Sequence, residues 1–199
     1  MDYAPVADVL TNPGNTAIGT RSFGSDASMV ADMVIKELEG LSSQGVFGAV
    51  KHFPGQGGVS GDSHDGAVTL DKSLEELMQT ELVPFQKALE NGVSFVMVGH
   101  ISVPQVVGDN TPASLSQMMV SNVLREQLGY QGIVITDAMN MGAVTGNYTA
   151  DQAAVMAVNA GVDMILMPQD YETAYNGLLQ AVQDGRFRRN ASTNLWSVL

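Results

Sequence analysis

The stretch "GIVITDAMNMGAV" at residues 132–144 is the strongest indication of the fold. Its first half is a continuous run of apolar and β-branched side chains, without polar residues at alternate positions. A strand with one face in water alternates apolar and polar residues, so this run predicts a strand buried on both faces of a parallel sheet. Asp137 follows the run directly, at the end of the strand where parallel α/β folds place their functional residues.

Similar apolar runs recur along the chain and alternate with helical patterns. The expected strands lie at 4–9, 46–50, 94–98, 132–136 and 163–167. Apolar residues at helical spacing predict helices over 26–40 and 73–92, and Pro84 predicts a kink in the second helix or its division into two. This order predicts an α/β domain, either a doubly wound sheet or part of a (β/α)8 barrel.

Local signals mark the expected helix ends. Ser73 with Glu76, and Thr149 with Gln152, have the spacing of capping boxes at helix starts. Glycines stand where helices should end, namely Gly40, Gly92, Gly129 and Gly161.

The composition and net charge of the chain argue against several kinds of partner and site. The 199 residues suit one core-forming domain, and a formal net charge of −12 repels phosphate backbones, so we expect no nucleic-acid partner. The chain has no cysteine, which excludes disulfides and thiolate metal sites. No apolar run approaches the ~18 residues of a membrane span, so we expect no membrane-spanning segment.

Polar residues follow several of the expected strands or lie in the loops beside them, so they should meet at one edge of the sheet. A glycine-rich segment at 51–66, "KHFPGQGGVSGDSHDG", contributes several of them. The set comprises Arg21, Lys51, His52, Asp62, His64, His100 and Asp137.

These residue types suit the hydrolysis of a glycosidic bond. A carboxylate at the end of a buried strand is held ionised only by nearby cations or donors, and Asp137 in that state can attack carbon, as the nucleophile of a retaining glycosidase does. Such an enzyme needs a second group that protonates the leaving oxygen, and the imidazole of His64 suits this task. Asp62 can bind the other ring nitrogen and select the tautomer.

The segments "KHFPGQGGVSGDSHDG", "MVGHISVP" (97–104), "TPASLS" (111–116) and "GIVITDAMNMGAV" resemble glycoside hydrolase family 3, in particular its β-N-acetylglucosaminidase branch. The resemblance implies a TIM-type (β/α)8 barrel and a substrate with terminal β-linked N-acetylglucosamine, such as peptidoglycan fragments or chitooligosaccharides. It implies that Asp137 is the nucleophile and that Asp62 and His64 form the acid/base dyad, which the β-glucosidase branch lacks. The substrate-binding residues that we expect are Arg21, Lys51, His52 and His100.

The chain departs from the family pattern at three places. Gln56, Gly57 and Gly58 stand where the family usually has His-Gly-Asp, so we expect altered loop order with the dyad intact. We expect a single catalytic-domain fragment over 1–199 that begins inside the barrel, with about five of eight βα units and any sorting signal in a preceding segment. The end of the chain, at 185–199, differs from the charged helical tail of the family.

Other functions stay open at this stage. Transfer to phosphate instead of water is compatible with a histidine acid/base, which repels an incoming anion less than a carboxylate does. Metal-dependent hydrolysis would use His52, Asp62, His64 and Asp137 as ligands, although Lys51 beside His52 disfavours a dication, and we expect neither a metal nor a cofactor. A sugar-binding fragment without turnover and a β-glucosidase are further alternatives.

Each candidate residue also has a purely structural interpretation. Asp137 could be a helix N-cap, and Asp62 and His64 could be turn formers. His100 could be a hydrogen-bonded core residue, and Arg21 could form a surface ion pair.

Overall fold

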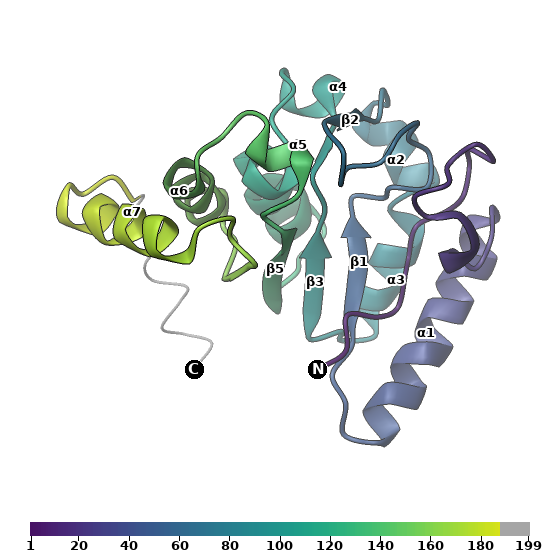
Figure 1. The fold of residues 1–199 in the computed structure, drawn as a ribbon. Coiled ribbons are helices and arrows are strands. Elements are labelled where there is room, and N and C mark those ends of the chain that lie inside the picture. Colours follow the sequence, from purple (N-terminus) through teal and green to yellow (C-terminus); the bar gives the residue numbers. More distant parts are fainter. Residues whose placement is uncertain (188–199) are drawn as a thin grey trace.

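The computed structural model describes residues 1–187 and has a parallel sheet at its centre (Figure 1). The sheet has four strands in the order β1, β3, β5, β6, and each neighbouring pair is parallel. The strands span Ala49–Phe53 (β1), Phe95–Val98 (β3), Ile133–Ala138 (β5) and Met164–Leu166 (β6). Two short strands, β2 (Val68–Thr69) and β4 (Ile101–Ser102), form a second parallel pair. The α/β class is therefore confirmed.

Helices connect the strands in the order expected for βα units. In Figure 1, α1 and α3 lie beside β1, whereas α6 and α7 lie beyond β5. The α-helices are α1 (Ala27–Ser43), α2 (Leu74–Gln79), α3 (Val83–Glu90), α4 (Pro104–Val107), α5 (Gly142–Thr145), α6 (Ala150–Ala160) and α7 (Tyr171–Gln183). Two 3-10 turns, η1 (Gly19–Arg21) and η2 (Ala113–Leu115), and a π-helix, η3 (Met118–Gln127), complete the described elements. None of the helices within residues 1–187 combines the length and apolar character needed to cross a membrane.

The two central strands explain why the apolar runs are continuous. β3 and β5 pair from Phe95 opposite Ile133 to Val98 opposite Thr136. Val96, Val98 and Val134 are fully buried in the main core. These three side chains share one face of the sheet, and Met97 and Ile135 on the other face are also buried, so both faces of these strands leave water, as a continuous apolar run predicts.

The local helix signals are largely confirmed. The capping box at the start of α2 forms, with the Glu76 N–H donating to Ser73 Oγ at 3.3 Å and the Ser73 N–H donating to Glu76 Oε2 at 2.8 Å. Pro84 lies in the first turn of α3, so the region 73–92 contains two helices. The expected stop at Gly40 is wrong, because α1 continues to Ser43 and ends before Gly45, whose φ of 70° suits glycine.

Two of the expected strands differ from the structure. The segment 4–9 is an irregular edge, with Asp2 and Val6 forming isolated parallel bridges to Gly48 and Lys51. Pro5 lies between these bridges and has no N–H to donate, which prevents regular pairing there. The strand expected at 46–50 is displaced to Ala49–Phe53, so Lys51 and His52 lie within β1 and do not follow it.

Candidate active site

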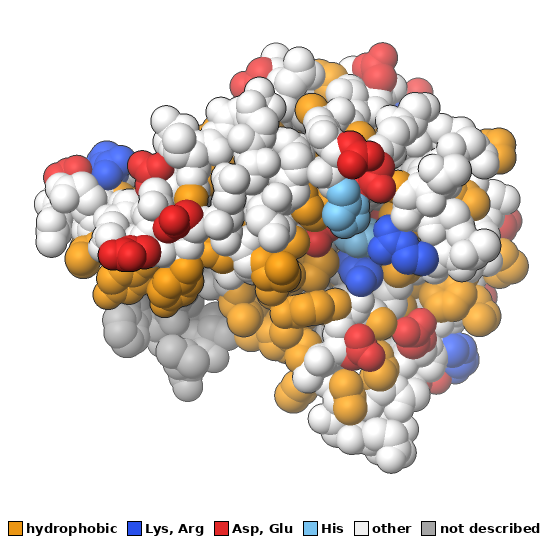
Figure 2. Space-filling view, viewed as in Figure 1, with side chains coloured by type: hydrophobic (Ala, Val, Ile, Leu, Met, Phe, Trp, Pro, Cys, Tyr) orange, Lys and Arg blue, Asp and Glu red, His pale blue; other side chains and the backbone are white. Residues whose placement is uncertain are grey.

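The candidate residues gather where the strands end and their connecting loops begin. Lys51 and His52 come from β1, Asp137 from the end of β5, and His100 from the turn between β3 and β4. Figure 2 shows histidine, acidic and basic side chains next to one another on one face of the molecule. The structure therefore brings together residues that are distant in the sequence, as the strand pattern predicted.

A row of three side chains leads from the protein interior to Asp137. The fully buried Asp8 places its Oδ2 atom 2.7 Å from His52 Nδ1. A carboxylate only accepts hydrogen bonds, so His52 donates through Nδ1–H and directs Nε2 toward the site. His52 Nε2 lies 3.9 Å from Asp137 Oδ2, which is too long for a hydrogen bond. Asp8 thereby sets the orientation of the imidazole beside the expected nucleophile.

Asp8 is a site residue that the sequence patterns did not indicate. Besides His52 Nδ1, it accepts the backbone N–H of Gln56 at 2.6 Å and that of His52 at 3.3 Å, both through Oδ1. One signal was present, because a carboxylate inside the apolar run "APVADV" has to find donors when it is buried. The identity of those donors could not be read locally, since they lie 44 and 48 positions further along the chain.

We expect Asp8→Ala to destabilise the protein by roughly 3 kcal/mol, because it leaves two backbone N–H groups and an imidazole N–H buried without their acceptor. Chemical denaturation monitored by circular dichroism would measure this loss. Asp8→Asn is the matched control, since it keeps an acceptor oxygen and should be less destabilising than Asp8→Ala. Equal stability of Asp8→Ala and the unmodified protein would contradict this account of the buried contacts.

The dyad predicted at the loop is formed in the structure. His64 Nδ1 lies 2.7 Å from Asp62 Oδ1, and the His64 backbone N–H donates to the same oxygen at 2.9 Å. These two bonds lower the pKa of Asp62, with the backbone bond as the larger cause, and the charge of Arg21 lowers it further. An ionised Asp62 holds the proton of His64 on Nδ1, which leaves Nε2 as the nitrogen able to exchange a proton. The His64 side chain is 62% exposed, so solvent and ligands can reach it.

Lys51 and Arg21 supply positive charge near the carboxylates. Burial lowers the pKa of Lys51, and the charge of Arg21 lowers it further, whereas the charges of Asp137 and Asp8 raise it. Arg21 is exposed and donates to the carbonyl oxygen of Ala17 at 2.6 Å. Both cations thus lie within electrostatic range of the dyad or the expected nucleophile, where the hydroxyl groups of a sugar could bind.

His100 is buried in the core and contacts the backbone next to Asp137. It is 1% exposed, and burial lowers its pKa. Its Nε2–H donates to the carbonyl of Ala138 at 3.0 Å, so its Nδ1, 2.7 Å from Ser114 Oγ, accepts from that hydroxyl. With both ring nitrogens paired, His100 is suited to hold the backbone that follows Asp137, and less suited to contact a sugar.

The residues considered as metal ligands do not converge into a cluster. Among residues 1–187, no group of three or more histidine, aspartate and glutamate side chains is placed to hold a metal ion. The described site is instead a pair of dyads, Asp8 with His52 and Asp62 with His64.

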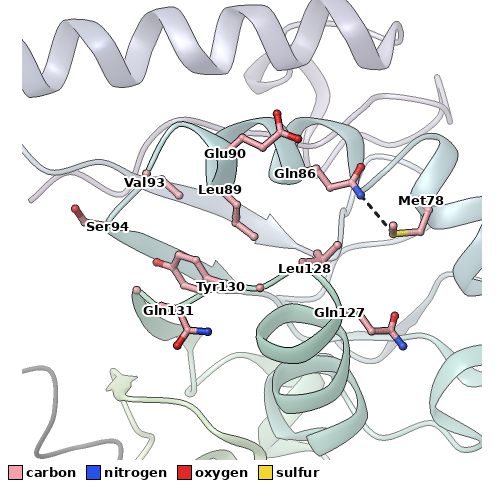
Figure 3. Close-up of a pocket in the computed structure, with 13 residues that line it drawn as sticks. Met78, Gln86, Leu89, Glu90, Val93, Ser94, Gln127, Leu128, Tyr130 and Gln131 are labelled. Atoms are coloured by element: carbon pink, nitrogen blue, oxygen red, sulfur yellow. Dashed lines mark hydrogen bonds between the residues drawn. The ribbon is translucent and has the colours of Figure 1, made fainter.

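A cavity of about 590 Å³ opens at the opposite end of the strands (Figure 3). It lies between the C-terminal ends of α3 and η3, with Leu89, Leu128 and Tyr130 among its apolar lining. Glu90 is the only charged side chain among the described residues that line it. Because it lacks paired acid and base groups, and because α/β folds place chemistry at the carboxyl ends of their strands, we place the active site at the dyads.

Comparison with known proteins supports the α/β fold described above. Beta-hexosaminidase LpqI of Mycobacterium tuberculosis is 37% identical over 199 aligned residues, which cover 96% of this chain and 50% of that protein. The structure of a glycoside hydrolase family 3 beta-N-acetylglucosaminidase from Paenibacillus sp. superposes with a TM-score of 0.94 at 38% identity, covering 98% of this chain and 38% of that one. The beta-glucoside phosphorylase BglX has a TM-score of 0.90 at 26% identity, with coverages of 95% and 35%.

These similarities confirm the expected TIM-barrel-type α/β fold, over the part of the barrel that this chain contains. The chain spans about half the length of LpqI, and less of the other two proteins. The tail expected to be atypical from 185 onward lies outside the described residues from position 188. The family model described as "Glycosyl hydrolase family 3 N terminal domain" matches residues 1–194, and the chain therefore belongs to glycosyl hydrolase family 3.

Proposed function

We propose that the complete protein is a retaining β-N-acetylglucosaminidase that removes terminal β-linked N-acetylglucosamine. The observation that carries the proposal is the Asp62–His64 dyad on a loop whose backbone is hydrogen-bonded to the start of α5, the helix that follows the strand of Asp137. The carbonyls of Ser63 and His64 accept the N–H groups of Ala143 and Gly142 at 3.1 and 3.0 Å. Similarity to proteins named beta-hexosaminidase and beta-N-acetylglucosaminidase supports the same substrate class.

In the first step, Asp137 attacks the anomeric carbon while His64 donates its Nε2 proton to the leaving oxygen. The bond between the sugar and its leaving group breaks, and a glycosyl ester forms on Asp137. Lys51 and Arg21 hold sugar hydroxyls, and Asp62 stabilises the imidazolium form of His64. Of the two dyads, only Asp62–His64 transfers protons in this scheme.

In the second step, His64 Nε2 takes a proton from water, and the water oxygen attacks the anomeric carbon. The ester bond breaks, Asp137 becomes a carboxylate again, and the sugar leaves with its β configuration retained. His52, oriented by Asp8, stays beside Asp137 throughout and accepts a hydrogen bond from a sugar hydroxyl through Nε2.

Trapping the intermediate tests this proposal directly. The complete protein is incubated with a slow fluorinated N-acetylglucosaminyl donor, and its intact mass is measured before peptide mapping. One added sugar on the peptide that contains Asp137 is the expected result, with none on the Asp137→Ala variant. A sugar on another peptide would remove the nucleophile assignment. Binding of the donor without any adduct would support a sugar-binding protein without turnover.

A β-N-acetylglucosaminide phosphorylase is the second candidate, favoured by two observations. The acid/base candidate is a histidine, which does not repel phosphate as a second carboxylate would, and Arg21 lies close enough to influence Asp62. The similarity to a beta-glucoside phosphorylase adds weight to this alternative. Product analysis with and without inorganic phosphate separates the two reactions, because only the phosphorylase releases sugar 1-phosphate.

A further inference from the structure

Gln56 lies at the centre of a buried hydrogen-bond network between the two dyads. It is 3% exposed, and its backbone N–H donates to Asp8 Oδ1 at 2.6 Å. Its carbonyl accepts from Asn15 Nδ2 at 2.6 Å, and its side-chain Nε2 donates to Ser63 Oγ at 3.1 Å. One residue thus contacts the carboxylate that orients His52 and the serine that lies between Asp62 and His64.

Ser63 anchors the loop that bears the acid/base dyad. It is 1% exposed, whereas the side chains of Asp62 and His64 are 37% and 62% exposed. Its hydroxyl is held by Gln56, and its carbonyl accepts the N–H of Ala143 at 3.1 Å. The Gln56 side chain and the backbone that follows Asp137 therefore both hold Ser63 in place.

The segment around the dyad is rich in glycine, and Asn12 also contacts it, with Nδ2 donating to the Val59 carbonyl and to Ser60 Oγ, both at 3.1 Å. Gly57, Gly58, Gly61 and Gly66 flank the dyad, and glycine gives the backbone the widest range of conformations. Position 57 also needs glycine for close packing, since a Cβ there would meet the carbonyl of Val9. A buried amide that satisfies a buried hydroxyl is a specific tether for such a segment.

We infer that Gln56 is a positioning residue, which holds the Asp62–His64 dyad at the site through Ser63 while its backbone holds Asp8 and thereby His52. This inference rests on the proposed function, and it adds a residue that touches neither the sugar nor the reacting atoms. Gln56 makes this contact at the position where the sequence departs from the family pattern, so the loop there keeps a polar anchor. The same residue couples the acid/base dyad to the side of the site that contains the nucleophile.

The test uses Gln56→Leu in the complete protein, because leucine keeps the backbone N–H to Asp8 and removes the side-chain donor to Ser63. Two substrates are compared, a β-N-acetylglucosaminyl disaccharide, whose leaving group needs a proton, and an activated aryl glycoside, which does not. We expect kcat/KM for the disaccharide to fall about tenfold, the equivalent of one buried hydrogen bond, and kcat/KM for the aryl glycoside to change less than twofold, because kcat/KM reports the first step, in which His64 acts as the acid. Gln131→Leu, an exposed glutamine at the other end of the strands, is the matched control.

Two further variants separate positioning from general damage to the fold. Ser63→Ala should reproduce the effect of Gln56→Leu, and the double variant should show no larger loss, because both remove the same contact. In a His64→Ala background, Gln56→Leu should leave the disaccharide rate unchanged. Equal losses on both substrates, or a full tenfold loss in the absence of His64, would overturn the inference.

Amide hydrogen exchange provides a measurement that needs no turnover. If Gln56 holds the loop, Gln56→Leu should speed exchange at Gly142 and Ala143, whose N–H groups bond the loop carbonyls, and leave α6 unchanged. Unchanged exchange at these two amides would overturn the inference. If the complete protein releases no sugar from either substrate, the proposed function fails, and the exchange rates still decide whether Gln56 holds the loop.

Discussion

Asp137→Ala is expected to abolish turnover in the complete protein, with kcat falling on the order of 10⁴-fold or more. The side chain ends β5, accepts the backbone N–H of Ala138 at 2.8 Å through Oδ1, and faces His52 Nε2 with Oδ2. Alanine removes the atom that would bond to the anomeric carbon in the proposed mechanism. Steady-state release of N-acetylglucosamine from an aryl glycoside measures the loss.

The control for this experiment is Asp32→Ala, which removes an exposed carboxylate from α1 and should leave kcat unchanged. Thermal unfolding of both variants shows whether the fold survives. Turnover retained by a folded Asp137→Ala protein would remove the nucleophile assignment. It would leave the family membership intact, because that rests on the match over residues 1–194.

His64→Ala is expected to lower kcat by roughly 10² to 10⁴-fold on substrates with poor leaving groups, the range for loss of a general acid. Activated aryl glycosides should be affected less in the first step, because their leaving groups depart without a proton. The measurement is kcat/KM for a series of aryl glycosides plotted against the pKa of the released phenol. A steeper dependence than in the unmodified protein is expected, and an unchanged slope would favour a structural role for the loop.

Asp62→Ala provides the companion experiment. Hydrogen bonds from His64 lower the pKa of Asp62. The Asp62 carboxylate is therefore ionised at every pH above the ordinary pKa range of an aspartate, and for some way below that range. The dyad therefore keeps its negative partner as the pH falls, and loses it only in stronger acid. We expect Asp62→Ala to show the same preference for good leaving groups as His64→Ala, with a smaller loss, since the imidazole remains but its tautomer and orientation are no longer fixed.

Much of the fold could be predicted because its signals are local. The runs at 94–98 and 132–136 became β3 and β5, and Pro84 divided the helical region as expected. These features depend on side chains within one element and on the missing N–H of proline, both of which can be read from a short window. The predicted boundaries of β1 and α1 were less accurate. Pairing with residues 2–7 sets the limits of β1, and the turn at Gly45 sets the end of α1.

Local sequence patterns likewise indicated one part of the candidate site and missed the contacts between distant segments. The spacing of Asp62 and His64 indicated the dyad, because a contact across two positions is local, whereas the roles of these residues and of Asp137 in catalysis stay predictions. Asp8 was overlooked because its partners come from β1 and the loop beyond it. The pairing of both ring nitrogens of His100 likewise depends on Ser114 and Ala138, from two other parts of the chain.

Hydrophobic period and helix caps were enough to predict the parallel α/β class, and resemblance in short motifs indicated the family and the residues of the candidate site. Three contacts became visible in the folded chain alone: Asp8 with His52, His100 with Ser114 and Ala138 in the core, and Gln56 with both Asp8 and Ser63. A buried polar group needs a hydrogen-bond partner, and it takes one from whichever segment the fold brings within reach. That partner is chosen by packing between distant segments, which local sequence patterns do not encode.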